Sequence, residues 1–164
     1  MTTLRNLKKY KKILILDCDG VLTNGRTYYS SEGRILKVFN SSDSYAIKNF
    51  KNKSMNIIVL TSDLLGFNIV KARARDWGIE AYCEDDKLSF IKDIKEKNPK
   101  AEIYFVGNGP EDIVIFNQVN TFFAPKDSRK EVLEKNGSDS FVLIDKNGGE
   151  GVLDDVYDYL YSDG

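Results

Sequence analysis

Two aspartates separated by a single residue follow an apolar run near the start of the chain. Ile13–Leu16 reads as a buried strand, and Asp17 and Asp19 come directly after it. Two carboxylates held close together repel each other strongly, unless a cation lies between them or one of them is protonated. The spacing therefore predicts a cation site or a proton-sharing pair at the end of this strand.

Other polar side chains follow later apolar runs in the same way. Thr61 and Ser62 come after one run, Asn108 comes after another, and Lys87 stands before a long helical segment. Ligands of open parallel sheets bind beyond the carboxyl ends of the strands. We therefore expect Thr61 and Asn108 to converge with the aspartates on one edge of a sheet.

The chain contains no histidine, which excludes Ser-His and Cys-His nucleophile pairs and histidine acid–base chemistry. Oxygen ligands without histidine or cysteine favour a hard cation, Mg²⁺ above all, and Mg²⁺ often shares its coordination shell with a substrate phosphate. Hydroxyl and backbone N–H groups at a strand end suit phosphate oxygens. Two aspartates, a threonine and a lysine around Mg²⁺ make a residue set for phosphoryl transfer to an aspartate.

The composition is that of a soluble globular domain, with 41% hydrophobic and 30% charged residues among 164. A net charge of −1 gives no reason to expect a nucleic acid partner. No run approaches the ~20 apolar residues of a membrane span, and the N-terminus lacks the apolar core of a signal peptide. Cys18 and Cys83 are far apart and form no CxxC motif. We therefore expect a cytoplasmic protein that does not bind membranes.

Apolar runs of strand length alternate with segments of helical periodicity. The runs that read as strands are Ile13–Leu16, Ile57–Leu60, Ile103–Val106, Phe122–Ala124 and Phe141–Ile144. The segments that read as helices are Ser44–Lys53, Leu64–Trp77, Lys87–Lys97, Glu111–Gln118, Arg129–Lys135 and Leu153–Tyr161. Apolar strands that do not alternate belong in a parallel sheet covered on both faces. The expected fold is a Rossmann-like three-layer α/β/α sandwich forming a single domain over residues 1–164.

One segment departs from this alternation. Arg26–Tyr29 and Ile35–Phe39 are two β-rich pieces joined by the sequence SSEG. The pattern predicts a β-hairpin inserted directly after the acidic pair.

The motifs, taken in order, resemble those of haloacid dehalogenase-like phosphatases that lack a separate cap domain. The narrower group includes phosphatases of 3-deoxy-octulosonate 8-phosphate and nonulosonate 9-phosphates, and the phosphatase-like domain of acylneuraminate cytidylyltransferases. The stretches that carry the resemblance are DCDGVLTNG (17–25), FNSSDSYAI (39–47), VLTSD (59–63), DDKLSFI (85–91), VGNGPED (106–112) and GGEGVLDDV (148–156). Together they cover nearly the whole chain.

The resemblance implies a role for each matching position. Asp17 would be the nucleophile that becomes an aspartyl phosphate, and Asp19 the general acid and base, with its backbone carbonyl facing Mg²⁺. Thr61, Ser62 and Lys87 would hold the transferred phosphoryl group. In this family the hairpin helps to build a homotetramer, in which a neighbouring subunit partly covers each site, and Arg26–Phe39 fits that use.

The metal loop departs from the family pattern, which is close to GDDxxD. Asn108 stands where a carboxylate usually binds the metal, and Asp112 is a further candidate ligand. An amide oxygen can bind Mg²⁺ but brings no charge. Ser42 and Asp43 are candidate substrate residues, since their surroundings look more like those of nonulosonate phosphatases than of octulosonate phosphatases. The sequence GGEG at 148–151 favours the same choice.

Two other interpretations use the same residues. Receiver domains of two-component signalling also carry an acidic pair, a threonine and a lysine, but their phospho-accepting aspartate lies on a later strand. Chain order therefore disfavours a receiver. The second alternative is a catalytically weak domain kept as an oligomerisation or regulatory module in nonulosonate or acylneuraminate cytidylyltransferase-type biosynthesis. Asn108 favours that module, whereas the retained Asp17, Asp19, Thr61 and Lys87 favour an active phosphatase.

Overall fold

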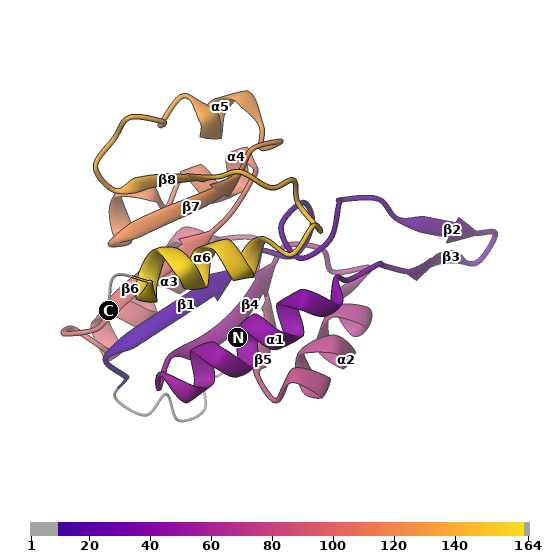
Figure 1. Ribbon diagram of the computed structural model, residues 1–164. Coiled ribbons are helices and arrows are strands. Elements are labelled where there is room, and N and C mark those ends of the chain that lie inside the picture. Colours follow the sequence, from indigo (N-terminus) through magenta and orange to yellow (C-terminus); the bar gives the residue numbers. More distant parts are fainter. Residues whose placement is uncertain (1–9, 163–164) are drawn as a thin grey trace.

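The computed structural model describes residues 10–162, which build one central parallel sheet (Figure 1). Its strands are β1 (Lys12–Leu16), β4 (Asn56–Thr61), β5 (Glu80–Cys83), β6 (Glu102–Val106), β7 (Thr121–Pro125) and β8 (Phe141–Ile144). The strand order is β5-β4-β1-β6-β7-β8, and every neighbouring pair is parallel. Strand β1, which leads into the acidic pair, therefore lies inside the sheet.

The two faces of the sheet are both apolar, as the continuous hydrophobic runs predict. On β1, Leu14 and Leu16 pack into one core cluster, whereas Ile13 and Ile15 pack into the other. All four side chains are fully buried. Successive side chains of a strand point to opposite faces, so an unbroken apolar run fills two cores at once.

Helices cover both faces. Helices α1 (Ser41–Asn52), α2 (Phe67–Trp77) and α6 (Val152–Tyr161) supply side chains to the core cluster that contains Leu14. Helix α3 (Lys87–Lys97), the short helix α5 (Lys130–Leu133) and the 3-10 helix η1 (Phe116–Gln118) supply the other cluster. The predicted three-layer α/β/α architecture is thus confirmed.

The predicted hairpin is confirmed between β1 and α1. Its strands, β2 (Tyr28–Ser30) and β3 (Gly33–Leu36), pair only with each other and are antiparallel. The hairpin projects as an arm from the side of the molecule on which β1 ends (Figure 1). The insertion therefore leaves the body of the protein at the edge where the polar side chains were expected.

Three elements differ from the expectation. Strand β5 was missed, because its sequence EAYC is short and lies at the edge of the sheet. The helix expected over Glu111–Gln118 is instead the one-turn helix α4 (Pro110–Ile113) followed by η1. The regular pairing of the hairpin is shorter than Arg26–Phe39.

None of the helices within residues 10–162 combines the length and the apolar character that crossing a membrane would require.

Candidate active site

Three neighbouring strands end together at the edge of the sheet from which the hairpin leaves. Leu16 of β1 lies in register with Val59 of β4 on one side and with Val106 of β6 on the other. Asp17 comes one position beyond this row, and Thr61 and Asn108 come two positions beyond it. The expected convergence of these side chains follows directly from the parallel register.

A buried lysine joins two carboxylates at this edge. Lys87, the first residue of α3, places Nζ 2.7 Å from Asp17 Oδ1 and 2.6 Å from Asp112 Oδ1. All three side chains are almost completely buried. The aspartates come from β1 and α4, so the ammonium group holds three segments of the chain together.

Burial and the neighbouring charges change the pKa values of Asp17 and Lys87. Burial, together with the charge of Asp112, raises the pKa of Asp17 to about 8, although Lys87 acts in the opposite direction. Burial alone would lower the pKa of Lys87, but the charges of Asp17 and Asp112 outweigh it and raise that pKa. A further positive charge beside Asp17 would therefore favour its ionised, nucleophilic form.

Asp112 organises the loop that precedes it. Its Oδ2 accepts hydrogen bonds from the backbone N–H groups of Asn108 and Gly109, at 2.9 and 3.1 Å, while its Oδ1 binds Lys87. The side chain has no exposed surface. Both oxygens of Asp112 thus hold groups of the protein in position. Its direct ligation of a metal stays a prediction.

Asn108 lies at the point where the loop meets the acidic pair. Its Oδ1 is buried and has no hydrogen-bond partner among the described residues. Its amide packs against Gly20, where a Cβ atom would lie 1.9 Å from Asn108 Nδ2. Gly20 therefore allows the amide to approach the residues that follow β1.

The donor set fits a divalent cation of the Mg²⁺ type. No three or more acidic or cysteine side chains within residues 10–162 form a group placed to hold a metal. However, the orphaned Asn108 amide oxygen and the Asp17 carboxylate are oxygen ligands of the kind that hard cations prefer. A cation bound there would satisfy the amide oxygen and offset the charge beside Asp17.

The Asp19 carboxylate is partly exposed, with 32% of its side-chain surface accessible. Thr23 donates its hydroxyl to Asp19 Oδ1 at 3.2 Å, and Lys37 donates to Asp19 Oδ2 at 2.5 Å. The sequence interpretation missed Lys37. The available signal was a lysine within the run ILKVF, where an apolar residue would be ordinary.

The two hydroxyl residues after β4 have different surroundings. Thr61 is buried, and its Oγ1 accepts a hydrogen bond from the N–H of Asp63 at 3.1 Å. Ser62 donates its hydroxyl to the carbonyl of Glu84 at 3.1 Å. Thr61 thus keeps a hydroxyl proton for a ligand, whereas Ser62 would contribute through its backbone N–H.

A polar cavity of about 740 Å³ opens beside Asp19 and the metal loop. Its walls include Asp19, Gly20, Asn108, Arg129 and Lys130. The general acid candidate Asp19 and the metal-loop residue Asn108 therefore border the same space, which is large enough for a small sugar phosphate.

The glycines near residue 148 complete this edge. A Cβ atom on Gly148 would lie 2.0 Å from the carbonyl oxygen of Gly20, and Gly149 donates its N–H to Val21 at 2.8 Å. The loop before α6 therefore packs its backbone directly on the loop that carries the acidic pair. No larger residue fits at position 148 without displacing one of them.

Ser42 and Asp43, the candidate substrate residues, make structural contacts within the protein, and their contact with substrate stays a prediction. Ser42 donates its hydroxyl to Asn40 Oδ1 at the start of α1. Asp43 is 1% exposed, and its Oδ1 accepts a hydrogen bond from the N–H of Leu153 at the start of α6. Asp43 therefore joins the first helix to the last.

Comparisons with known proteins agree with the fold and the motifs. The 3-deoxy-D-manno-octulosonate 8-phosphate phosphatase of Haemophilus influenzae is 28% identical over 154 residues, covering 91% of this chain and 82% of the relative. No protein-family model matches the chain.

Solved structures share the fold. A cobalt-bound deoxy-D-mannose-octulosonate 8-phosphate phosphatase from H. influenzae has a TM-score of 0.79 at 25% identity, covering 94% of this chain and 88% of that one. A haloacid dehalogenase-like hydrolase from Legionella pneumophila has a TM-score of 0.81 at 25% identity, covering 94% and 84%. The resemblance that the motifs indicate is therefore confirmed.

Asp43 generates a prediction about stability and pH. Burial raises its pKa to about 7, well above the 3.8 of the unfolded chain. Its contribution to stability is therefore complete below pH 4 and is lost as pH rises through 7. We expect Asp43→Asn, which keeps the acceptor for Leu153, to exceed the parent protein in unfolding free energy by about 1–2 kcal/mol at pH 8.

Urea denaturation at pH 5 and pH 8 measures this difference. The advantage of Asp43→Asn should shrink at pH 5, because Asp43 is then mostly protonated. Asp43→Ala is the control, since it loses the hydrogen bond to Leu153 and should be destabilised at both pH values. An advantage of Asp43→Asn that does not change with pH would contradict the prediction.

Proposed function

We propose that this chain is a Mg²⁺-dependent phosphatase that hydrolyses a sugar-acid phosphate through an aspartyl phosphate on Asp17. The observation that carries the proposal is the buried Lys87 between Asp17 and Asp112, at the strand end where Thr61 and Asn108 also converge. The named activities of the relatives, which act on a sugar-acid phosphate, support the same reaction class.

In the first step, an Asp17 carboxylate oxygen attacks phosphorus and the bond between phosphorus and the sugar oxygen breaks. Lys87 offsets charge beside the transferred group, and the Thr61 hydroxyl is available to donate to one of its oxygens. Asp19, which lines the cavity, gives its proton to the departing sugar oxygen. The products are the free sugar acid and phosphorylated Asp17.

In the second step, Asp19 is a carboxylate and takes a proton from a water molecule. The water oxygen attacks phosphorus, and the bond between phosphorus and Asp17 breaks. Inorganic phosphate leaves, the Asp17 carboxylate is restored, and Asp19 holds a proton again. The partial exposure of Asp19 suits an exchange with both sugar and water.

The cation would be held by the Asp17 carboxylate, the backbone carbonyl of Asp19 and the Asn108 amide oxygen. When bound, Mg²⁺ would neutralise charge on the phosphate and help to keep Asp17 ionised. Asp112 would act on the cation indirectly, by fixing the backbone of Asn108 and Gly109. Cobalt in the H. influenzae relative supports a divalent metal.

Two observations support the proposed substrate class: the activities of the relatives, and the positions where this sequence departs from the pattern of octulosonate phosphatases. The curated relatives act on an octulosonate 8-phosphate. The sequences around Ser42 and at 148–151 favour a nonulosonate 9-phosphate. Both compounds are primary phosphates of acidic sugars, and Arg129 and Lys130 on the cavity wall suit the acidic group.

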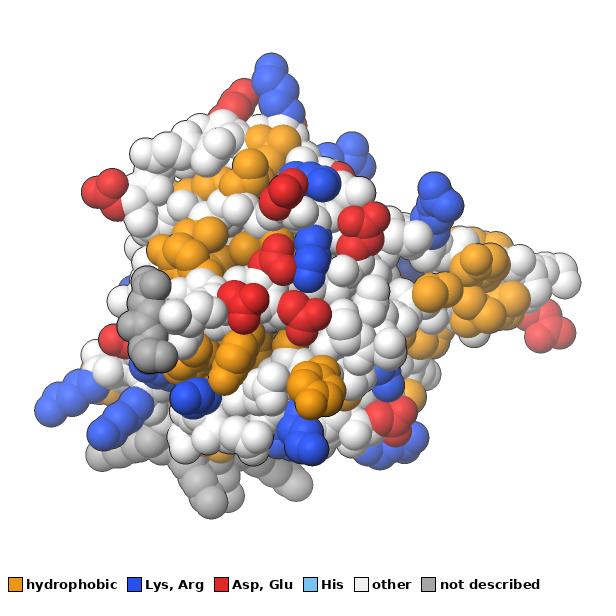
Figure 2. All heavy atoms as spheres, in the orientation of Figure 1, with side chains coloured by type: hydrophobic (Ala, Val, Ile, Leu, Met, Phe, Trp, Pro, Cys, Tyr) orange, Lys and Arg blue, Asp and Glu red, His pale blue; other side chains and the backbone are white. Residues whose placement is uncertain are grey.

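The hairpin supports the proposal of a homotetramer. Tyr28, Tyr29, Ile35, Leu36 and Val38 are each at least 42% exposed. Hydrophobic side chains gather over this projecting arm (Figure 2). A patch of this kind, on a two-stranded arm that is marginal by itself, is typical of an interaction surface.

One observation favours the second candidate function, a catalytically weak assembly module. Asn108 removes a formal charge from the expected ligand set, and Gly109 follows it where the family pattern has a second aspartate. Such a module would keep the fold and the hairpin while turning over substrate slowly. Activity measurements distinguish the two candidates.

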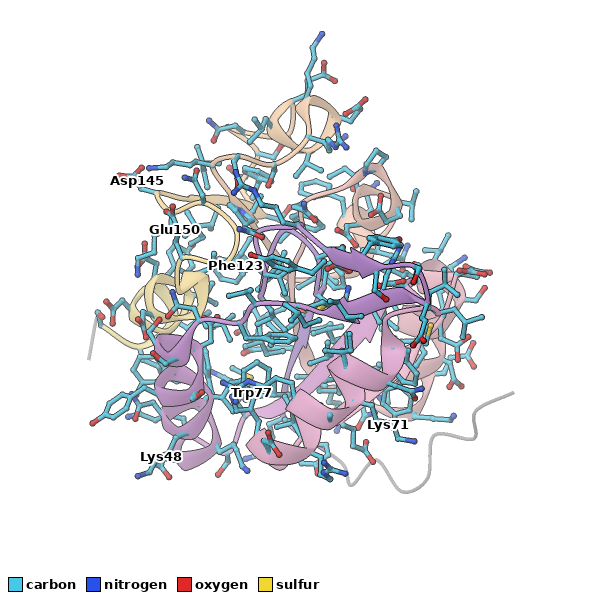
Figure 3. All side chains as sticks on the ribbon, turned by 90° about the vertical axis from the view of Figure 1, so that its right-hand side faces the viewer. Lys48, Lys71, Trp77, Phe123, Asp145 and Glu150 are labelled. Carbon is cyan, nitrogen blue, oxygen red and sulfur yellow. The ribbon has the colours of Figure 1, made fainter. Side chains whose placement is uncertain are left out.

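Within the proposed mechanism, the nucleophile generates the first prediction. We expect Asp17→Asn to lower turnover by about 1000-fold or more, because an amide cannot form the aspartyl phosphate. The measurement is phosphate release, with Mg²⁺ titrated, from octulosonate 8-phosphate, nonulosonate 9-phosphates and an aryl phosphate. Asp145→Asn is the control, since Asp145 lies at the periphery with its side chain 95% exposed (Figure 3). Equal turnover in Asp17→Asn and the parent protein would refute the assigned nucleophile.

The metal loop generates the second prediction. Asn108→Asp adds an anionic ligand, and we expect the Mg²⁺ concentration for half-maximal activity to fall by about tenfold. Asn24→Asp is the control, because it adds the same charge to the cavity wall outside the loop. If Asn108→Asp leaves the Mg²⁺ dependence unchanged, Asn108 is not a ligand.

The hairpin generates the third prediction. A charge on the exposed apolar face should oppose association, so we expect Ile35→Glu to reduce the mass measured by light scattering to that of a smaller species. Val114→Glu is the control, because Val114 is 56% exposed and lies outside the hairpin. A tetramer that persists in Ile35→Glu would exclude this face as the interface.

A further inference from the structure

Lys37 has a completely buried side chain and lies directly after β3, where the hairpin returns to the body of the protein. Its Nζ lies 2.5 Å from Asp19 Oδ2 and 2.7 Å from Asp63 Oδ2. The contact with Asp19 is a hydrogen bond, whereas the contact with Asp63 is an ion pair without hydrogen-bond geometry. A buried ammonium group thus bridges the acid–base candidate and the loop after β4.

The surroundings fix Lys37 in this position. Asp63 is itself held by the N–H of Gly66, at 3.1 Å, and by an ion pair with Arg34 of β3. A Cβ atom on Gly66 would lie 2.7 Å from Lys37 Cε and 2.2 Å from Asp63 Oδ2. A larger residue at this position would require the Lys37 or Asp63 side chain to shift. The site is therefore built around Lys37.

This contact distinguishes the two oxygens of Asp19. An ammonium group donates hydrogen bonds but cannot accept them, so a proton on Oδ2 would face another donor. Oδ1 has a different partner, the Thr23 hydroxyl at 3.2 Å, which can donate to an ionised carboxylate or accept from a protonated one. Oδ1 is thus the oxygen that can gain and lose a proton without breaking its contacts.

We infer that Lys37 is a positioning residue that fixes the Asp19 carboxylate so that Oδ1 exchanges the proton with the leaving group and with water. The inference rests on the proposed phosphatase function and extends it to a residue from the hairpin. Among the described residues, the Lys37 ammonium group pairs with Asp19 and Asp63 and not with the nucleophile Asp17. Its effect reaches the reaction only through Asp19.

A comparison of leaving groups tests this role. A sugar alkoxide needs a proton as its bond to phosphorus breaks, whereas p-nitrophenolate leaves readily without one. The ratio kcat/KM covers the steps up to transfer of the phosphoryl group to Asp17, so it isolates the acid step from the later attack by water. The substrates are the sugar-acid phosphate that turns over fastest and p-nitrophenyl phosphate.

We expect Lys37→Met to lower kcat/KM by about 10- to 100-fold for the sugar-acid phosphate and by less than about threefold for p-nitrophenyl phosphate. Lys37→Arg retains the positive charge and should restore part of the loss. Lys48→Met is the control, since Lys48 is exposed and projects outward from α1 (Figure 3). It should match the parent protein on both substrates.

A merely structural lysine would give a different result. Equal losses on both substrates, or no loss on either, would overturn the positioning role while leaving the phosphatase proposal intact. A parent protein that turns over neither substrate at high Mg²⁺ would remove the phosphatase proposal, and this inference with it.

The double variant Lys37→Met/Asp63→Asn guards against loss of the fold. Removing Lys37 alone leaves two carboxylates without their shared cation, which is destabilising. Asp63→Asn removes one of those charges while Asp19 still lacks its ammonium partner. We expect the double variant to unfold at a temperature closer to that of the parent and to show the same selective loss on the sugar-acid phosphate. An unselective loss in this folded variant would overturn the inference.

Discussion

The ion pairs of Lys87 are the interaction on which the rest of this site depends. Asp17 after β1 and Asp112 of α4 can be buried together only because an ammonium group lies between them. Breaking a buried pair by removing one partner costs about 3–5 kcal/mol, since it leaves an uncompensated charge. The same contacts keep the nucleophile candidate, the metal loop and α3 in fixed relation. Lys87 therefore contributes both to the stability of this edge of the sheet and to the reactivity of Asp17.

A second buried lysine repeats this arrangement on the other side of the acidic pair. Lys87 binds Asp17 from a helix, and Lys37 binds Asp19 from the hairpin. Each lysine is anchored by another carboxylate, Asp112 or Asp63. The two aspartates of the motif thus differ in their partners although they stand only two residues apart. This difference suits two carboxylates that would perform different steps.

The general architecture could be predicted from the sequence because hydrophobic burial determines it. Unbroken apolar runs indicated parallel strands, and helix α3 was predicted with its observed limits. In the structure, Asp86 caps its first turn. Strand β5 was missed because a short edge strand needs little apolar sequence. The metal-loop segment was expected to be one helix, but Asp112 turns inward to Lys87 and the helix ends after one turn.

Predicting the arrangement of the site residues required more than knowing where the strands end. The register of β1, β4 and β6 places Asp17, Thr61 and Asn108 together, and the sequence pattern is sufficient for that. The direction of the Asp112 side chain depends on how far Lys87 reaches into the core, which no local pattern encodes. The contacts of Lys37 and Asp43 could not be predicted for a similar reason. Each contacts an element far away in the chain, Asp43 at a separation of 110 residues.

The backbone contact between Gly148 and Gly20 has a consequence for how the protein is made. On the ribosome, the acidic pair is synthesised long before the glycine loop and α6 emerge. The contacts of the early segment with Gly148 and Gly149 form only after this late segment has been made. A nascent chain would therefore hold its nucleophile candidate in an unfinished loop throughout most of synthesis. These contacts would be completed only after the strands of the sheet have been synthesised.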